Sequence, residues 1–105
     1  GAIPDGICNL TNLTYLALGN MRHPGLDSEI PANIGNLANL THLFLDINNL
    51  TGTLPPDISE MTALKVMCLS NNPNLAGGIE RSIYNRLETC EFKGTKITIV
   101  DDPTE

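Results

Sequence analysis

The sequence predicts an α/β solenoid, a stack of short coils in which each coil contributes one strand to a parallel sheet. The pattern L-x-x-L-x-L begins at Leu13, Leu40 and Leu64, with Met67 in place of the second leucine of the third copy, so the copies start 27 and 24 residues apart. Within each copy, apolar residues alternate with other residues, which is typical of a strand with one buried face. A repeat of this length presents an extended surface rather than an enclosed pocket.

The chain divides into coils of unequal quality within what we expect to be one domain. The predicted units are a partial coil 1–12, whole coils 13–39, 40–63 and 64–86, and a degenerate capping coil 87–105. The partial coil matches the stretch that begins at Gly52 and therefore starts in mid-repeat. We expect Ile3, Ile7 and Leu10 to be exposed there, which would allow self-association through this uncapped end.

The strand of coil 40–63 shows how the side chains are sorted. Leu43 and Leu45 lie on either side of Phe44, so the leucines are expected to point into the core and Phe44 outward. Parallel strands lie about 4.8 Å apart, so outward positions should line up across the coils. The three predicted columns are Tyr15, His42, Val66 and Thr89; Ala17, Phe44, Cys68 and Glu91; and Gly19, Asp46, Ser70 and Lys93.

The residues after each strand predict how the chain turns away from the sheet. Asn48 and Asn72 follow their strands at the same spacing, where a side-chain amide can bond backbone groups left open by a turn. The segments Pro31 to Leu37 and Pro55 to Met61 are expected to form a turn of 3₁₀- or α-helix on the opposite side. Gly77-Gly78 is interpreted as a turn, not as a phosphate-binding loop.

These copies resemble the plant-type leucine-rich repeat family. Its consensus, L-x-x-L-x-L-x-x-N-x-L-x-G-x-I-P-x-x-[IL]-x-x-L, matches residues 40–61 almost throughout, and the resemblance extends from Gly1 to about Ile97. It implies a right-handed curved stack with a concave parallel sheet, convex turns or short helices, and partner binding on the concave face. Relatives include polygalacturonase inhibitors and the ectodomains of receptor-like proteins and receptor kinases, and the fold does not choose among them.

The chain departs from this consensus at its first and third whole coils. Coil 13–39 carries three extra residues around Arg22 to Gly25, and coil 64–86 has Glu80 where Pro is usual. Insertions mark projections from a repeat scaffold, so the Arg22 to Gly25 segment is a candidate loop for partner contact. The alternative is a tolerated bulge in the turn.

The outward columns supply the candidate binding residues. Phe44 stands between His42 and Asp46 on one strand, so it could act as an apolar anchor with polar groups beside it. Tyr15 could join it from the neighbouring strand. The alternative is that Phe44 packs on Tyr15 and Val66 without any ligand. The full candidate set is Tyr15, His42, Phe44, Asp46, Val66, Cys68, Ser70, Glu91 and Lys93.

Other classes of site are disfavoured. The net charge of −6 argues against nucleic acid and anionic membranes as partners, and no apolar run reaches transmembrane length. His42 and Asp46 have no third ligand nearby, so we expect no metal, and nothing indicates a cofactor. Cys68 near His42 would suggest a nucleophile and a base, but an open sheet lacks a water-excluding pocket, so we expect no enzyme.

The three cysteines leave at least one thiol unpaired within a monomer. Cys90 falls on an inward position and Cys68 on an outward one, which disfavours a disulfide between them. Cys8 falls on the far side of its coil, where a partner could have belonged to a missing cap.

Four N-x-[ST] sequons indicate a secretory history, although Asn-Leu-Thr arises partly from the repeat itself. Their acceptors are Asn9, Asn12, Asn39 and Asn49. We therefore expect a secreted or cell-surface glycoprotein, non-catalytic, that binds a protein or peptide in plant defence or receptor signalling. Two alternatives remain: a structural or ice-binding solenoid, which needs regular ranks of Thr, Ser or Asn, and an intracellular, cytoplasmic scaffold, which would carry no glycans.

Overall fold

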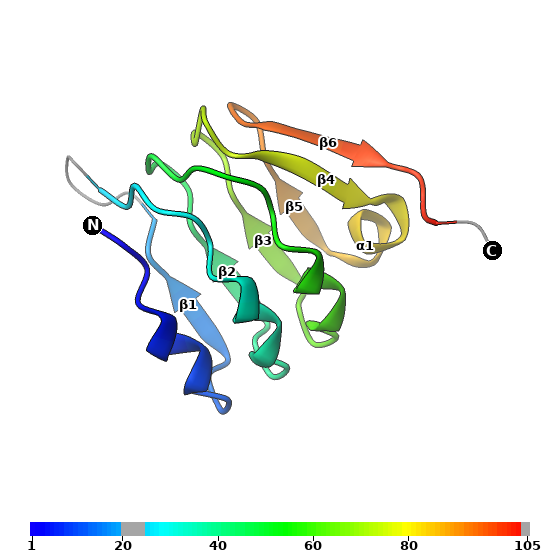
Figure 1. Ribbon diagram of the computed structural model, residues 1–105. Coiled ribbons are helices and arrows are strands. Elements are labelled where there is room, and N and C mark those ends of the chain that lie inside the picture. The colour runs from blue at the N-terminus through cyan, green and yellow to red at the C-terminus, as the bar shows by residue number, and fades with distance from the viewer. Residues whose placement is uncertain (20–24, 104–105) are drawn as a thin grey trace.

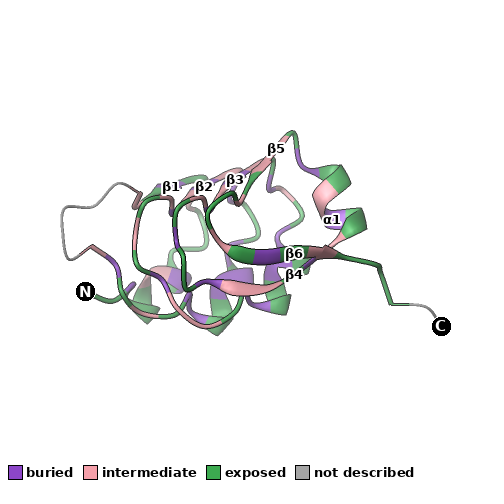
Figure 2. Ribbon diagram, turned by 90° about the horizontal axis from the view of Figure 1, so that it is seen from above, coloured by how far each residue is buried: buried purple, intermediate pink, exposed green. Residues whose placement is uncertain are grey.

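The computed structural model describes residues 1–19 and 25–103, which wind into a stack of coils (Figure 1). A β-sheet runs along one side of the stack and short helices run along the other (Figure 2). This arrangement confirms the predicted α/β solenoid. The insertion expected at Arg22 to Gly25 falls, apart from Gly25, outside the described residues. None of the described helices has the length and apolar composition that a membrane-spanning segment needs.

The main sheet has four parallel strands in the order β1-β2-β3-β5. They are β1 (Tyr15–Ala17), β2 (His42–Phe44), β3 (Val66–Cys68) and β5 (Thr89–Glu91). The register aligns Tyr15 with His42, His42 with Val66, and Val66 with Thr89. Ala17, Phe44, Cys68 and Glu91 align in the same way. Both of these columns are confirmed as predicted from spacing alone.

The opposite side of the stack is built from short helices that follow proline. The three 3₁₀-helices are η1 (Asp5–Asn9), η2 (Ala32–Asn36) and η3 (Pro56–Glu60). Each begins after a proline with an extended backbone, namely Pro4, Pro31 and Pro55. Proline has a fixed φ and no N–H to donate, so it is well suited to the position just before a helix. The third whole coil has Glu80 at this place and forms the α-helix α1 (Arg81–Arg86) instead.

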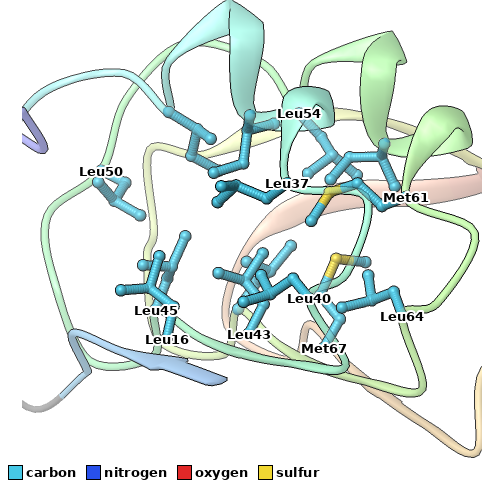
Figure 3. Packing of buried hydrophobic residues seen from close by; sticks show 14 of the residues in the cluster. Leu16, Leu37, Leu40, Leu43, Leu45, Leu50, Leu54, Met61, Leu64 and Met67 are labelled. Carbon is cyan, nitrogen blue, oxygen red and sulfur yellow. The ribbon is translucent and has the colours of Figure 1, made fainter. Parts of the chain in front are cut away.

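The core is a ladder of aliphatic side chains between the sheet and the helices (Figure 3). The leucines of coil 40–63 are sealed by the coils on both sides, and Leu40, Leu43, Leu45 and Leu50 are 0% exposed. Burying each such side chain contributes roughly 2 kcal/mol. Packing between coils, more than any single coil, therefore holds the strands in register.

A second, two-stranded sheet was not predicted. Strand β4 (Ala76–Glu80) pairs in parallel with β6 (Lys96–Val100). Gly77-Gly78 lies inside β4, so its interpretation as a turn was wrong. A pair of glycines is typical of a turn, which is why a turn was predicted. Here the missing side chains allow β6 to lie close, since a Cβ on Gly78 would lie 3.0 Å from Cγ1 of Val100. This pairing anchors the last coil to the third.

The partial coil at the start is more buried than expected. Ile3 is 4% exposed, so the prediction that it would be exposed was wrong. Its N–H donates to the Ser28 hydroxyl at 3.2 Å, and the Gly1 carbonyl accepts from the N–H of Asp27 at 2.9 Å. These bonds seat the opening segment on the first whole coil. Ile7 is half-buried, while Leu10 stays 54% exposed, as expected.

Candidate binding site on the outward face of the sheet

Three rings from the first two strands form an aromatic cluster on the outward face of the main sheet. Tyr15 stacks on His42 with ring centroids 5.3 Å apart and planes 26° apart. Phe44 lies 5.4 Å from Tyr15 and 6.2 Å from His42. The cause is the register, because Tyr15 aligns with His42 while Phe44 follows His42 on the same face after one inward residue. The predicted proximity of Tyr15 and Phe44 is confirmed, and their role in ligand binding stays a prediction.

The aromatic cluster is only partly covered by its own packing. Tyr15 is 57% exposed. His42 and Phe44 are half-buried, so Phe44 is less exposed than expected. Offset ring packing of this kind holds the side chains in place. The result is a firm apolar platform whose outer surface faces solvent.

The ring of His42 is oriented by a neighbouring hydroxyl. Nδ1 of His42 lies 2.8 Å from Oγ1 of Thr41, and that hydroxyl donates to the Thr14 carbonyl at 2.9 Å. A hydroxyl has one proton to give. When the hydroxyl gives its proton to the Thr14 carbonyl, the hydrogen of the Thr41–His42 contact is on Nδ1.

Asp46 occupies the outward position after the cluster and lies against Gly19 of the preceding coil. A Cβ on Gly19 would meet the Asp46 carboxylate and would lie 2.9 Å from the Asp46 carbonyl oxygen. Gly19 therefore leaves space for the Asp46 side chain. Among residues 1–19 and 25–103, the ion pairs are Gly1 with Asp27 and Arg81 with Asp101. The Asp46 carboxylate therefore has no cationic partner within this part of the chain.

The candidate residues from the later coils give a more mixed surface. Val66, Cys68 and Ser70 are half-buried, and Glu91 and Lys93 are exposed. The structure places Cys68 beside Phe44 and Glu91 in the sheet, and its thiol contacts the Ser70 hydroxyl at 4.0 Å. Cys68 and His42 are thus in different columns and do not form a nucleophile–base pair. No set of three or more His, Cys, Asp or Glu side chains within the described ranges could hold a metal ion.

The three thiols are free in the structure. Cys90 aligns with Met67 in the inward row, where spacing predicted it. Burial, and to a lesser extent the neighbouring Cys68, raise the pKa of Cys90 to about 11. Burial and then the charge of Asp5 raise the pKa of Cys8. Both groups therefore hold little thiolate at neutral pH and are poor nucleophiles.

Ile47, directly after Asp46, is a residue that sequence reasoning missed. Its φ is +55°, and its side chain is 46% exposed. A signal was present, because the matching position of the next two coils holds Asn71 and Gly94, both also at positive φ. Asn and Gly suit that conformation and Ile does not.

The four sequon asparagines are all exposed and lie outside the main strands. Asn9 ends η1, and the other three are in the connecting segments. The Asn39 amide donates to the Thr11 carbonyl at 2.9 Å. None of the four belongs to the outward columns of the main sheet.

Comparison with known proteins decides the family. Residues 39–61 match the family model described as Leucine Rich Repeat. A probable leucine-rich repeat receptor-like serine/threonine-protein kinase of Arabidopsis thaliana is 40% identical over 72 residues, which cover 69% of this chain and 8% of that protein. The chain is a leucine-rich repeat protein. The Arabidopsis thaliana receptor-like kinase EFR is 42% identical over 64 residues, which cover 60% of this chain and 6% of EFR. This leucine-rich repeat chain therefore spans less than a tenth of either relative.

Solved leucine-rich repeat structures superpose over nearly the whole chain. The PEPR1–AtPEP1 structure gives a TM-score of 0.79 at 25% identity and covers 96% of this chain and 16% of that one. The plant peptide hormone receptor RGFR1 in complex with RGF2 gives 0.66 at 30% identity, covering 92% and 19%. The ectodomain of the membrane receptor kinase GASSHO1/SCHENGEN3 of Arabidopsis thaliana, in complex with CASPARIAN STRIP INTEGRITY FACTOR 2, gives 0.70 at 30% identity, covering 94% and 11%.

Proposed function

We propose that this leucine-rich repeat chain is a non-catalytic recognition module that binds an extended peptide segment across the outward face of its main sheet. The observation that carries the proposal is the aromatic cluster, which is packed firmly yet leaves Tyr15 57% exposed. Beside it lies the Asp46 carboxylate, which has no cationic partner among the described residues. An apolar platform with a polar rim is the usual composition of an energetic centre in a binding surface.

The dimensions of the sheet favour a peptide as the ligand. Four strands at about 4.8 Å spacing span roughly 14 Å, the length of about four extended residues. Such a strip is too narrow for a standard globular interface by itself but suits a segment laid across the strands. The superposable RGFR1 structure is described as a plant peptide hormone receptor in complex with RGF2, which supports the same class of ligand here.

The relatives and the sequons support an extracellular or cell-surface location. GASSHO1/SCHENGEN3 is described as a plant membrane receptor kinase, and the part that superposes belongs to its ectodomain. All four sequon asparagines of this chain are exposed, so each is accessible for N-glycosylation. We place the module in a secreted or surface-anchored protein, with glycans on Asn9, Asn12, Asn39 and Asn49.

A peptide selection tests this function. A displayed library of random peptides of about twelve residues, enough to cross the sheet with flanking residues on both sides, is selected on the immobilised wild-type chain. Recovered peptides are synthesised and their Kd is measured against wild type, Phe44→Ala and Asp46→Lys. We expect Phe44→Ala to weaken binding by about tenfold or more. Leu10→Ala removes an apolar side chain that is more exposed than Phe44 and directly follows η1, and it should leave the Kd unchanged.

The result that would contradict the proposal is also specific. Equal affinity of the recovered peptides for wild type, Phe44→Ala and Asp46→Lys would move binding away from the aromatic cluster. Thermal melts of the three proteins exclude loss of folding as the cause of a weaker Kd.

A further inference from the structure

Ile47 adopts a backbone conformation that its side chain disfavours. Its φ of +55° lies in the left-handed region, where a β-branched residue is a genuine outlier. Strain of this kind persists only where the surrounding structure enforces it, and it gathers at functional sites. The fold enforces the conformation here: the Ile47 N–H donates to the Ser70 carbonyl at 2.9 Å and extends the sheet ladder past β2.

The other coils show that the fold does not require isoleucine at this position. The matching residues of the next two coils are Asn71, with φ +61°, and Gly94, with φ +81°. Asn and Gly adopt this conformation with little or no strain. The strain at Ile47 therefore comes from the residue type and is avoidable by a substitution that two other coils already carry.

The Ile47 side chain also contributes little to the hydrophobic core. It is 46% exposed, whereas Leu45 and Leu50 on either side of it in sequence are 0% exposed. A single exposed isoleucine is ordinary. Ile47 is exposed and strained, lies three residues after Phe44, and directly follows Asp46, whose carboxylate has no cationic partner among the described residues. This combination indicates a role outside the folded monomer.

The charge beside Ile47 indicates what would cover it. The Asp46 carboxylate lies on the Gly19 backbone and has no cation within ion-pair distance in the described part of the chain. Because Asp46 directly precedes Ile47, a ligand that contacts Ile47 would also lie near this carboxylate. A cationic side chain there gains a charge-assisted bond, while an anionic one is repelled.

We propose that Ile47 is a ligand-contact residue, and that Ile47 and Asp46 together select peptides with an apolar side chain next to a Lys or Arg. The proposal rests on the peptide-binding function proposed above and names the chemistry of its ligand. Ile47 is kept at the cost of stability because its apolar side chain is buried only in the complex.

The test measures stability and affinity on the same variant. Ile47→Asn copies the residue of the next coil, so we expect its Tm to rise by roughly 4–8 °C as the strain is released. Its Kd for the peptides recovered on the wild-type chain should be weaker by about tenfold. Val100→Thr is the matched control, since Val100 is 40% exposed but lies on β6, away from the main sheet. Its Kd should equal that of wild type.

A charge exchange tests the predicted peptide chemistry. Replacing the Lys or Arg of a recovered peptide by Glu should abolish binding to wild type, and Asp46→Lys should restore it in part. Binding of the Glu peptide to wild type at full affinity would overturn the cationic part of the proposal.

The outcomes separate this proposal from the function on which it rests. Recovery of no peptide at all on wild type overturns both. Recovered peptides that need Phe44 but bind Ile47→Asn as tightly as wild type leave the function standing and overturn the role of Ile47. A lower Tm for Ile47→Asn also overturns it, because Ile47 would then be a stabilising residue.

Discussion

The side-chain amides of Asn48 and Asn72 share one acceptor, the carbonyl of Leu45. Nδ2 of Asn48 lies 3.1 Å from that oxygen and Nδ2 of Asn72 lies 3.0 Å from it. Each amide oxygen accepts a backbone N–H in turn, from Leu26 at 3.0 Å and from Leu50 at 3.1 Å. The two residues thus form a hydrogen-bonded ladder through the inside of the turns, and the prediction that both are structural is confirmed.

Removing the side chain of Asn72, the more buried of the two asparagines, should lower stability strongly. Asn72 is 0% exposed, and its amide also donates to the Leu69 carbonyl at 2.9 Å. Asn72→Ala leaves several buried backbone groups unpaired, so we expect the free energy of unfolding to fall by about 3 kcal/mol. Urea denaturation measures this change. Asn74→Ala, at an exposed position with a 3.4 Å bond to Asn49, should cost less than about 0.5 kcal/mol, and an equal cost for both variants would contradict the ladder.

Gly35 lets successive helices approach each other on the side opposite the sheet. A Cβ on Gly35 would lie 2.6 Å from the carbonyl oxygen of Asp57 in η3. Gly35→Ala should therefore push η2 away from η3 and lower the free energy of unfolding by about 2 kcal/mol. Gly6→Ala in η1 is the control, because a Cβ there meets nothing within 4 Å. It should leave stability unchanged or slightly higher, and a neutral Gly35→Ala would contradict close packing of the two helices.

The raised pKa of Cys90 predicts a direction of pH dependence. The folded thiol has a pKa of about 11 against an ordinary value of 9.0, so the folded state holds its proton more tightly than the unfolded state. Stability should be full below pH 9 and should fall as the pH rises from 9 towards 11. Chemical denaturation of wild type and Cys90→Ser across this range isolates the contribution. A steeper loss in Cys90→Ser than in wild type would contradict the assignment.

Glycans should not interfere with the proposed site. The sequon asparagines lie outside the main strands, so N-glycans on them leave the outward columns open. We expect a chain from a secretory host to lose mass on treatment with a peptide N-glycosidase, while its Kd for recovered peptides stays the same. No loss of mass would remove the glycoprotein prediction, and a tighter Kd after treatment would show that a glycan covers the binding surface.

The register of the main sheet could be read from the sequence because each coil adds a strand at a nearly fixed spacing. The leucine positions repeat, and parallel pairing then fixes which outward residues are neighbours. This is why the contact of Tyr15 with His42 and Phe44 was predictable. The ring geometry was not, since spacing places side chains in a row without setting their rotamers.

The features that the sequence did not predict depend on contacts between coils. Strand β4 contains Gly77-Gly78, whose composition favours a turn, and only the approach of β6 makes a strand of it. Ile3 occupies the repeat position of the buried Leu54, but its burial depends on contact with the next coil, where its N–H donates to the Ser28 hydroxyl. The strain at Ile47 needs a measured φ, although its alignment with Asn71 and Gly94 was a usable signal.

The most direct test of the central claim is a map of where a recovered peptide sits. Amide chemical-shift changes of the isotope-labelled chain, followed by two-dimensional NMR during titration with one peptide, report contact residue by residue. If the peptide binds on the outward face, the largest changes should fall on Tyr15, His42, Phe44, Asp46 and Ile47. Largest changes on η1, η2 and η3 instead, with β1 and β2 unmoved, would contradict binding on the outward face of the sheet.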